Sequence, residues 1–124
     1  MPRPPAITQA ERRLHQRYPV QAPIRLYFEG RAAPIALATT NLSLYGCSIL
    51  TSPQLPVGIE VYARLSLGAH HIRIRGRVVT RHPELGNGIM FMNFKGDGEE
   101  RLRQFLEGLA PLAEKFRLQP TSAI

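Results

Sequence analysis

Three arginines stand close together near the start of the chain. Arg12, Arg13 and Arg17 fall within six residues, and Arg13 and Arg17 are four positions apart. The guanidinium group is planar, always charged, and carries a fork of donors that suits a phosphate group or the edge of a guanine base. We expect residues 11–20 to form an extended basic arm beside the folded body, because Pro19 disfavours a helix before it. Taken alone, an arm of this kind is more often only a solvated tail.

A second polar group lies in an uncharged turn at residues 41–46, about two dozen positions after Arg17. Asn41 and Ser43 are two positions apart, so on an extended backbone their side chains point the same way. They offer an amide and a hydroxyl, and each can donate and accept hydrogen bonds. Gly46 permits a positive φ or the close approach of another group. In isolation, such a turn most often bonds only its own backbone.

The positive charge is concentrated on two segments of the chain. The 124 residues carry a net charge of +7, and residues 1–31 hold six Arg against two Glu, a net +4. Residues 32–59 hold no charged side chain, whereas residues 60–83 hold five Arg against one Glu, again +4. Residues 95–117 hold five basic and five acidic groups. This concentration favours an anionic partner, such as a nucleotide, a nucleic acid or a lipid headgroup.

The sequence offers little to a catalytic or metal site. Cys47 is the only cysteine, which excludes an intrachain disulfide and a thiolate cluster for zinc. The four histidines have no metal-ligand spacing; they are His15, His70, His71 and His82. Ser43 as a nucleophile would need a base and an oxyanion site, and neither is indicated. We therefore expect no enzyme, no metal and no cofactor.

The middle of the chain shows the period of short β-strands. Apolar and polar residues alternate in six runs, at residues 24–29, 35–40, 47–51, 59–67, 72–78 and 89–94. Clusters of Gly and Pro separate the runs. In the fifth run Arg73, Arg75 and Arg77 alternate with apolar residues, which suits a strand with one packed face and one wet face. The pattern predicts a small antiparallel barrel or sandwich, an all-β fold.

A C-terminal helix follows the strands. Its apolar stripe has helical spacing and consists of Leu102, Phe105, Leu106 and Leu109. Asp97 is a plausible N-cap, with Glu100 three residues later, close to a capping box. Pro111 removes a backbone donor and should break or kink the helix after Ala110, with a further turn beyond it.

One domain is expected over residues 11–117. It divides into the basic arm, the barrel and the helix at residues 11–20, 21–95 and 96–117, between flexible tails at residues 1–10 and 118–124. The uncharged stretch of residues 32–59 is interrupted by polar residues and prolines, so we expect no membrane insertion. The first residues lack the apolar run of a signal peptide, and we expect a soluble cytoplasmic protein.

The arm and the turn together resemble the two signatures of the PilZ domain family, Arg-x-x-x-Arg and Asp/Asn-x-Ser-x-x-Gly. Both are complete, in the family's order and separation, in Arg13, Arg17, Asn41, Ser43 and Gly46. The six strands, the Gly-x-Gly-Ile-x-Phe run of residues 86–91 and the closing helix are also similar, so the resemblance covers roughly residues 11–117. It implies a six-stranded β-barrel receptor for cyclic di-GMP, a bacterial second messenger.

The resemblance also implies a ligand site whose chemistry fits these residues. The expected ligand-binding residues are Arg13, Arg17, Asn41, Ser43 and Gly46, with Arg12 either a further ligand residue or a solvated charge. The arginines would each fork onto a phosphate group or a guanine O6/N7 edge. Asn41 and Ser43 would meet a guanine's polar edge from the barrel side, and Gly46 would leave room for a base or sugar.

We therefore expect a sensor or adaptor for signal transduction, as a monomer or a homodimer. Residues 1–20 bury too little apolar surface to be ordered by themselves, so the ligand is expected to order the basic arm and relay the signal to an unidentified protein effector. One alternative is a small basic barrel that binds single-stranded nucleic acid, which an aromatic content of 7% without Trp disfavours. The other is a PilZ-like protein-interaction module without nucleotide binding, which the complete signatures disfavour.

Overall fold

The structure, a computed structural model, describes the backbone of residues 15–117 and the side chains of residues 15–109. Arg12, Arg13 and the two expected tails at residues 1–10 and 118–124 lie outside these described residues. The elements are β1 (Pro23–Tyr27), β2 (Ile35–Leu42), β3 (Gly46–Ile49), β4 (Glu60–Leu67), β5 (His70–His82), β6 (Gly86–Phe94) and the helix α2 (Gly98–Arg117). No helix within the described part of the chain is long and apolar enough to cross a membrane.

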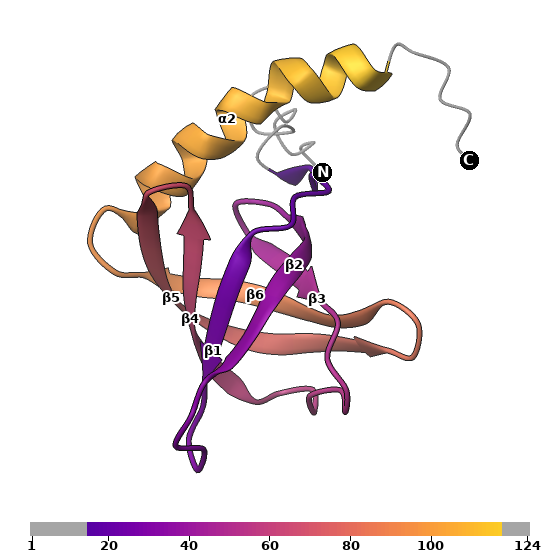
Figure 1. Ribbon diagram of the computed structural model, residues 1–124, viewed down its shortest axis with the longest axis vertical. Helices are drawn as coiled ribbons and strands as arrows, with labels where there is room; N and C mark the ends of the chain where they lie inside the picture. Colours follow the sequence, from indigo (N-terminus) through magenta and orange to yellow (C-terminus); the bar gives the residue numbers. More distant parts are fainter. Residues whose placement is uncertain (1–14, 118–124) are drawn as a thin grey trace, which may run out of the picture.

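The strands form a closed antiparallel barrel in the order β1-β2-β3-β6-β5-β4 (Figure 1). β1 pairs with β2 on one side and with β4 on the other, and these two pairings close the sheet. Closure leaves no unpaired strand edge, which suits a sheet this small. The predicted six-stranded antiparallel barrel with a C-terminal helix is thus confirmed.

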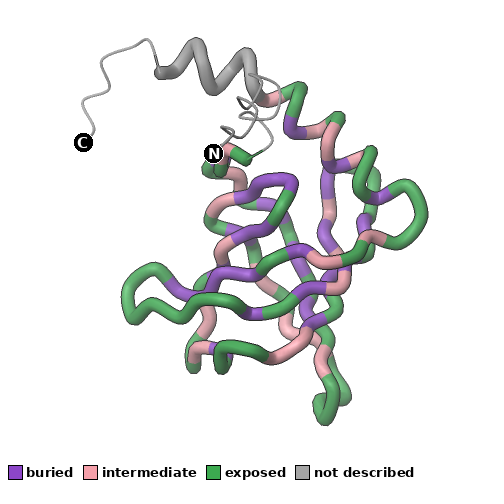
Figure 2. The backbone as a smooth tube through the Cα atoms, turned by 180° about the vertical axis from the view of Figure 1, so that it is seen from behind, coloured by how far each residue is buried: buried purple, intermediate pink, exposed green. Residues whose placement is uncertain are grey.

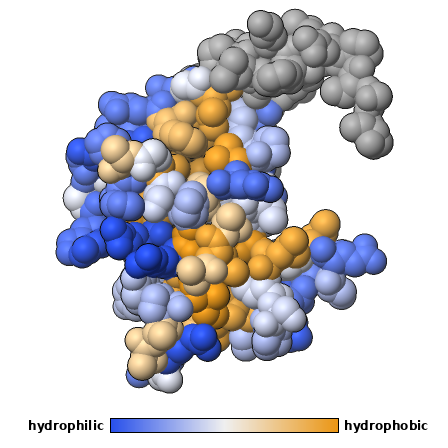
Figure 3. Space-filling model, viewed as in Figure 1, coloured by the Kyte–Doolittle hydropathy of each residue, from blue (hydrophilic) through white to orange (hydrophobic). Residues whose placement is uncertain are grey.

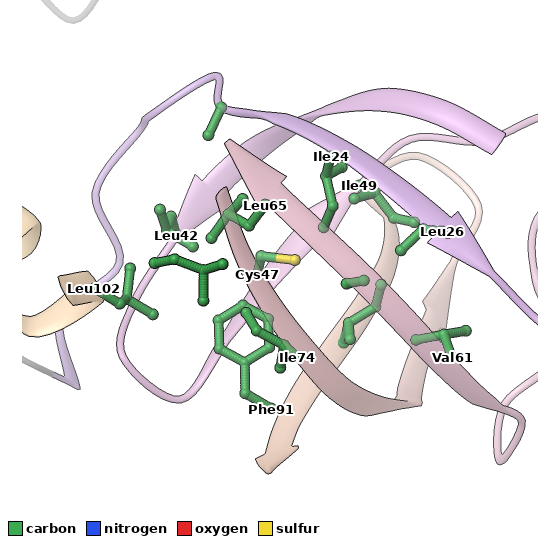
Figure 4. Packing of buried hydrophobic residues seen from close by; sticks show 14 of the residues in the cluster. Ile24, Leu26, Leu42, Cys47, Ile49, Val61, Leu65, Ile74, Phe91 and Leu102 are labelled. Atoms are coloured by element: carbon green, nitrogen blue, oxygen red, sulfur yellow. The ribbon is translucent and has the colours of Figure 1, made fainter. Parts of the chain in front are cut away.

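The barrel is filled by the inward side chains of alternating strand positions. Figure 2 shows buried and exposed residues alternating along the strands, as expected for a sheet with one face packed and the other in solvent. Fully enclosed side chains with 0% exposure include Leu26, Val61 and Leu65. Figure 4 shows the Cys47 thiol among these apolar side chains, which confirms that Cys47 is a core residue.

The buried thiol of Cys47 should be chemically inert in the folded protein. Burial raises its pKa from 9.0 to about 12, against a smaller opposing effect of the Arg17 charge. Thiol reagents need an accessible thiolate, so at about pH 8 a chromogenic disulfide should leave the folded chain unmodified and react after unfolding in guanidinium chloride. The absorbance of the released thiolate measures both states. Prompt reaction of the folded protein would contradict this enclosed position.

The helix α2 runs across one end of the barrel (Figure 1). Leu102 and Leu106 on its inner side are 0% exposed and belong to the barrel core, which confirms the predicted apolar stripe. We expected Pro111 to break or kink the helix, with a further turn beyond it; the helix is not broken there and continues to Arg117. A proline removes only its own N–H from the hydrogen-bond ladder, and this loss does not end the helix here.

The start of α2 differs from the expected capping box. The helix begins directly after Asp97, whose carboxylate accepts a hydrogen bond from Arg101 Nε at 2.9 Å. This hydrogen bond lowers the pKa of Asp97. Glu100 forms an ion pair with Arg103 at 3.8 Å. Both carboxylates are therefore engaged by arginines on the helix surface, in place of the reciprocal backbone bonds that we expected.

A buried asparagine fixes the connection between β3 and β4. Asn87 is 1% exposed, and its Oδ1 accepts the Leu55 N–H at 2.7 Å. Its Nδ2 donates to the carbonyl oxygens of Leu55 and Thr80, at 2.9 and 3.1 Å. These bonds tie the connection to the β5–β6 hairpin, so the glycine-flanked residue of the Gly-x-Gly run has a structural role.

Candidate ligand-binding site

The described part of the basic arm is hydrogen-bonded to the barrel. Tyr18 is 2% exposed, and the backbones of Tyr18 and Leu42 exchange two hydrogen bonds of 2.9 Å. The Thr39 hydroxyl donates to the Val20 carbonyl at 2.6 Å and accepts the Ala22 N–H at 3.0 Å. Protein atoms alone make these contacts, so the expectation that a ligand orders the whole arm is wrong from Tyr18 onward.

Arg17 and Asn41 bring the arm and the turn together. Arg17 Nη1 donates to Asn41 Oδ1 at 2.8 Å across 24 residues of sequence. Arg17 is exposed and Asn41 is half-buried. Because the amide oxygen of Asn41 accepts from the guanidinium, its amide nitrogen is the atom of this side chain that can donate to a further group. Among residues 15–109 no carboxylate forms an ion pair with Arg17.

The Ser43 hydroxyl is used inside the turn. Its oxygen accepts the Tyr45 N–H at 3.2 Å, and its hydroxyl donates to the Gly46 carbonyl at 3.3 Å. The Ser43 N–H bonds the same Gly46 carbonyl at 2.8 Å, and the residue is 2% exposed. Ser43 therefore supports the turn. We expected its hydroxyl to share the open surface of Asn41, and it does not.

Ser43→Ala should lower the free energy of unfolding by about 1–3 kcal/mol, because it leaves the Tyr45 N–H without its buried acceptor. Urea unfolding followed by circular dichroism measures this change. Ser48→Ala is the matched control, since Ser48 is half-buried on the adjacent strand and no hydrogen bond of its hydroxyl occurs among the described residues. Equal stability of both variants would show that the turn does not depend on the Ser43 hydroxyl.

Gly46 is required by the packing of β3 against β6. A Cβ at this position would clash with the carbonyl oxygen of Ile89 and would lie 3.4 Å from Arg17 Nη2. Gly46 is directly opposite Met90 in the register of the two strands. A side chain at this position is therefore excluded by β6 and the Arg17 side chain, and the expected contact of Gly46 with a base or sugar stays a prediction.

An aromatic pair at the turn was missed by sequence reasoning. The rings of His15 and Tyr45 are stacked, with their centroids 4.2 Å apart and their planes at 22°. Tyr45 remains 46% exposed at the tip of the turn that Ser43 supports. The only sequence signal was a tyrosine at an unspecified position of the Asn-x-Ser-x-x-Gly motif. The pair adds a flat apolar surface beside the polar groups of the site.

Comparisons with known proteins show the family and the fold. A family model described as PilZ domain matches residues 11–108. The fold is similar to the PilZ domain of CeSA from a cellulose-synthesizing bacterium, at 18% identity and a TM-score of 0.59, covering 77% of this chain and 98% of that one. It is also similar to the Bacillus subtilis inhibitor of motility MotI/DgrA, at 13% identity and a TM-score of 0.59, covering 83% of this chain but only 50% of that protein. No curated protein sequence matches the chain.

Proposed function

The chain belongs to the PilZ domain family, and we propose that it is a receptor for cyclic di-GMP that relays this signal to a protein partner. PilZ domains are receptor or adaptor domains. The observation that carries the proposal is the hydrogen bond of 2.8 Å between Arg17 and Asn41, because it joins one residue of each family signature on one open surface.

The proposed binding mode uses the donors of Arg17 and Asn41 that make no hydrogen bond among the described residues. The amide nitrogen of Asn41 and the remaining guanidinium N–H groups of Arg17 all donate, and guanine offers the acceptors O6 and N7 on one edge. The Tyr45 ring offers a stacking surface for the base. Arg13, which lies outside the described residues, is the proposed second fork, and Arg12 is a candidate for a further contact. Ser43 and Gly46 hold the turn that presents Asn41.

The proposed relay uses the arm as the changing surface. From Tyr18 onward the arm is already bonded to β2, so we place the ligand-dependent change ahead of His15. A ligand held between Arg13 and the turn would alter the surface that a partner protein contacts. The ligand shifts the population toward the partner-binding state only to the extent that it binds this state more tightly than the other state. The partner is a protein whose recognition depends on the occupied arm.

Isothermal titration calorimetry with cyclic di-GMP tests the proposed function. Cyclic di-AMP is the matched control, because it keeps both phosphates but presents a donor, the adenine N6 amino group, where guanine presents the acceptor O6. We expect saturable binding of cyclic di-GMP and much weaker binding of cyclic di-AMP. Absence of cyclic di-GMP binding would leave a protein-interaction module, and equal binding of both would contradict the guanine contacts.

Trypsin digestion tests the assigned roles of the arm residues. Cleavage after Arg17 should be slow with or without ligand, because Tyr18 is buried and hydrogen-bonded. Cleavage after Arg13 should be slowed by saturating cyclic di-GMP, since the bound guanidinium is withdrawn from the protease. Mass spectrometry of the fragments distinguishes the two cuts. Arg13→Lys keeps the trypsin site but loses the fork, so ligand protection should be lost in that variant. Unchanged cleavage after Arg13 at saturation would remove Arg13 from the binding site.

A further inference from the structure

The outer wall of the barrel carries a row of basic residues. Arg64 of β4 is directly opposite Arg25 of β1 on one side and Arg73 of β5 on the other. Lys95 extends the row, since its N–H bonds the Arg73 carbonyl at 3.0 Å. Neighbouring strands are about 4.8 Å apart, and like charges directly opposite each other are destabilising. Within residues 15–109 no carboxylate pairs with any of the four cations.

A row of aromatic and amide side chains runs parallel to the arginine row, two residues along the strands. Tyr27 of β1 is directly opposite Tyr62 of β4, and the two are 39% and 55% exposed. The row continues to Arg75 of β5, which donates to Asn93 Oδ1 at 2.7 Å and pairs with Glu60 at 3.5 Å. A row that contains two tyrosines therefore lies beside a row of cations on the outside of the barrel.

The two rows border a hollow of about 530 Å³. It is lined by Tyr27, Tyr62, Arg64, Arg73, Asn93 and Lys95, among others. This volume lies in the range of sites for small ligands or single nucleotide units. A second hollow of about 260 Å³ shares Arg64 and continues to Arg25, Ser66 and His71. Together the hollows form a basic track, which we call the β4–β5 face.

The β4 and β5 part of this face lies on the opposite side of the barrel from the strands of the Arg17–Asn41 site, while the second hollow also reaches Ala36 and Leu37 of β2. In the closed strand order β5 is three strands from β2 in either direction, and β4 is three strands from β3. Figure 3 shows strongly hydrophilic side chains along the side of the molecule where Figure 1 draws β4 and β5. Neither Arg17 nor Asn41 lines either hollow, so the two surfaces share neither of these side chains.

We propose that the β4–β5 face binds single-stranded nucleic acid, with bases stacked on Tyr27 and Tyr62 and phosphates held by Arg25, Arg64, Arg73 and Lys95. Single-strand binding sites combine a basic groove with exposed aromatic rings in this way. An acidic peptide would neutralise the cations but give the two exposed rings no planar partner. A single nucleotide would fill only one of the two joined hollows. The low aromatic content argued against this activity, but two of the four tyrosines lie side by side next to the row of basic residues.

Fluorescence anisotropy of a labelled oligothymidylate of about 12 nucleotides, titrated with the full chain at about 0.15 M salt, tests the proposal. Log affinity should fall with log salt at a slope of roughly −2 to −3, as expected for three or four phosphate contacts on a single strand. Tyr62→Ala should weaken binding by roughly 5- to 150-fold, the loss of one stacked base. Arg64→Gln should weaken binding and reduce the magnitude of the slope by about 0.7.

Arg77→Gln is the matched control, because Arg77 is exposed on β5 but does not line either hollow. It makes the same charge change and should reduce affinity much less than Arg64→Gln. Three results would each overturn the proposal: no binding at this salt concentration, equal losses at Arg64 and Arg77, or displacement of the oligonucleotide by saturating cyclic di-GMP. Binding of polyglutamate in preference to the oligonucleotide would overturn it in favour of an acidic protein partner.

Discussion

Arg17→Lys should weaken the binding of cyclic di-GMP by roughly 10- to 150-fold, the equivalent of about 1.5–3 kcal/mol for hydrogen bonds of a charged group. Arg17 donates one N–H to Asn41 Oδ1 at 2.8 Å, and its other N–H donors lie in the same plane and can bind the ligand. A lysine ammonium keeps the charge but has no planar fork with which to hold Asn41 and the ligand together. The loss should appear in calorimetry without a loss of stability, because Arg17 is exposed.

Two further variants separate geometry from charge. Arg77→Lys makes the same substitution at an exposed position of β5 and should leave the affinity nearly unchanged. Asn41→Ala should weaken binding, and its effect should not add to that of Arg17→Lys, because the two side chains act through one shared hydrogen bond. Equal small losses at Arg17 and Arg77 would mean that the positive charge attracts the ligand only as a diffuse field. Full additivity of Arg17→Lys and Asn41→Ala would mean that the two residues contact the ligand independently.

The period of apolar residues was sufficient to predict the barrel and the helix. Alternation such as Ile72, Ile74 and Val78 against arginines requires one buried and one wet face, and these three residues are indeed buried. The same holds for the helical stripe through Leu102 and Leu106. These are local signals, because the side chains that share a face are only two to four residues apart.

The turn could not be predicted from an extended backbone. We placed Asn41 and Ser43 on one face, but β2 ends at Leu42 and the chain turns at Ser43, so the hydroxyl points back into the turn. Gly46 was assigned to the ligand, yet the constraint on it comes from the carbonyl of Ile89, 43 positions later in the sequence. No pattern within residues 41–46 contains that information, because it arises from the pairing of β3 with β6.

The β4–β5 face shows the same limit of prediction from the sequence, here for the charged residues. The sequence shows that residues 60–83 are basic, and we interpreted the arginines of β5 as the wet face of a strand. The register of the strand pairs decides more than the number of basic residues. It sets Arg64 between Arg25 and Arg73, and it sets Tyr27 opposite Tyr62, which joins residues from three strands into two rows. Strand pairing over this separation is a property of the closed barrel and cannot be derived from composition.

Leu106→Ala should lower the free energy of unfolding by about 2–5 kcal/mol, because it removes buried methyl groups and leaves a cavity between α2 and the barrel. Leu106 is 0% exposed and belongs to the same core as the strands. A small domain has a total stability of about 5–15 kcal/mol, so the loss would be a large fraction of it.

Urea unfolding followed by circular dichroism measures this loss as a lower midpoint at an unchanged slope, which indicates a change in stability alone. Leu85→Ala makes the same substitution where the side chain is 68% exposed and should change the stability little. A Leu106→Ala midpoint equal to that of Leu85→Ala would show that α2 does not hold the end of the barrel.

The packing of α2 also bears on the ligand site. Since the helix packs on the barrel through Leu102 and Leu106, its release would also open the barrel end where Leu102 lies near Leu42 (Figure 4). Leu42 is bonded to Tyr18 of the arm. In Leu106→Ala, which weakens the packing of α2 on the barrel, the affinity for cyclic di-GMP should therefore fall. In Leu85→Ala the affinity should remain unchanged.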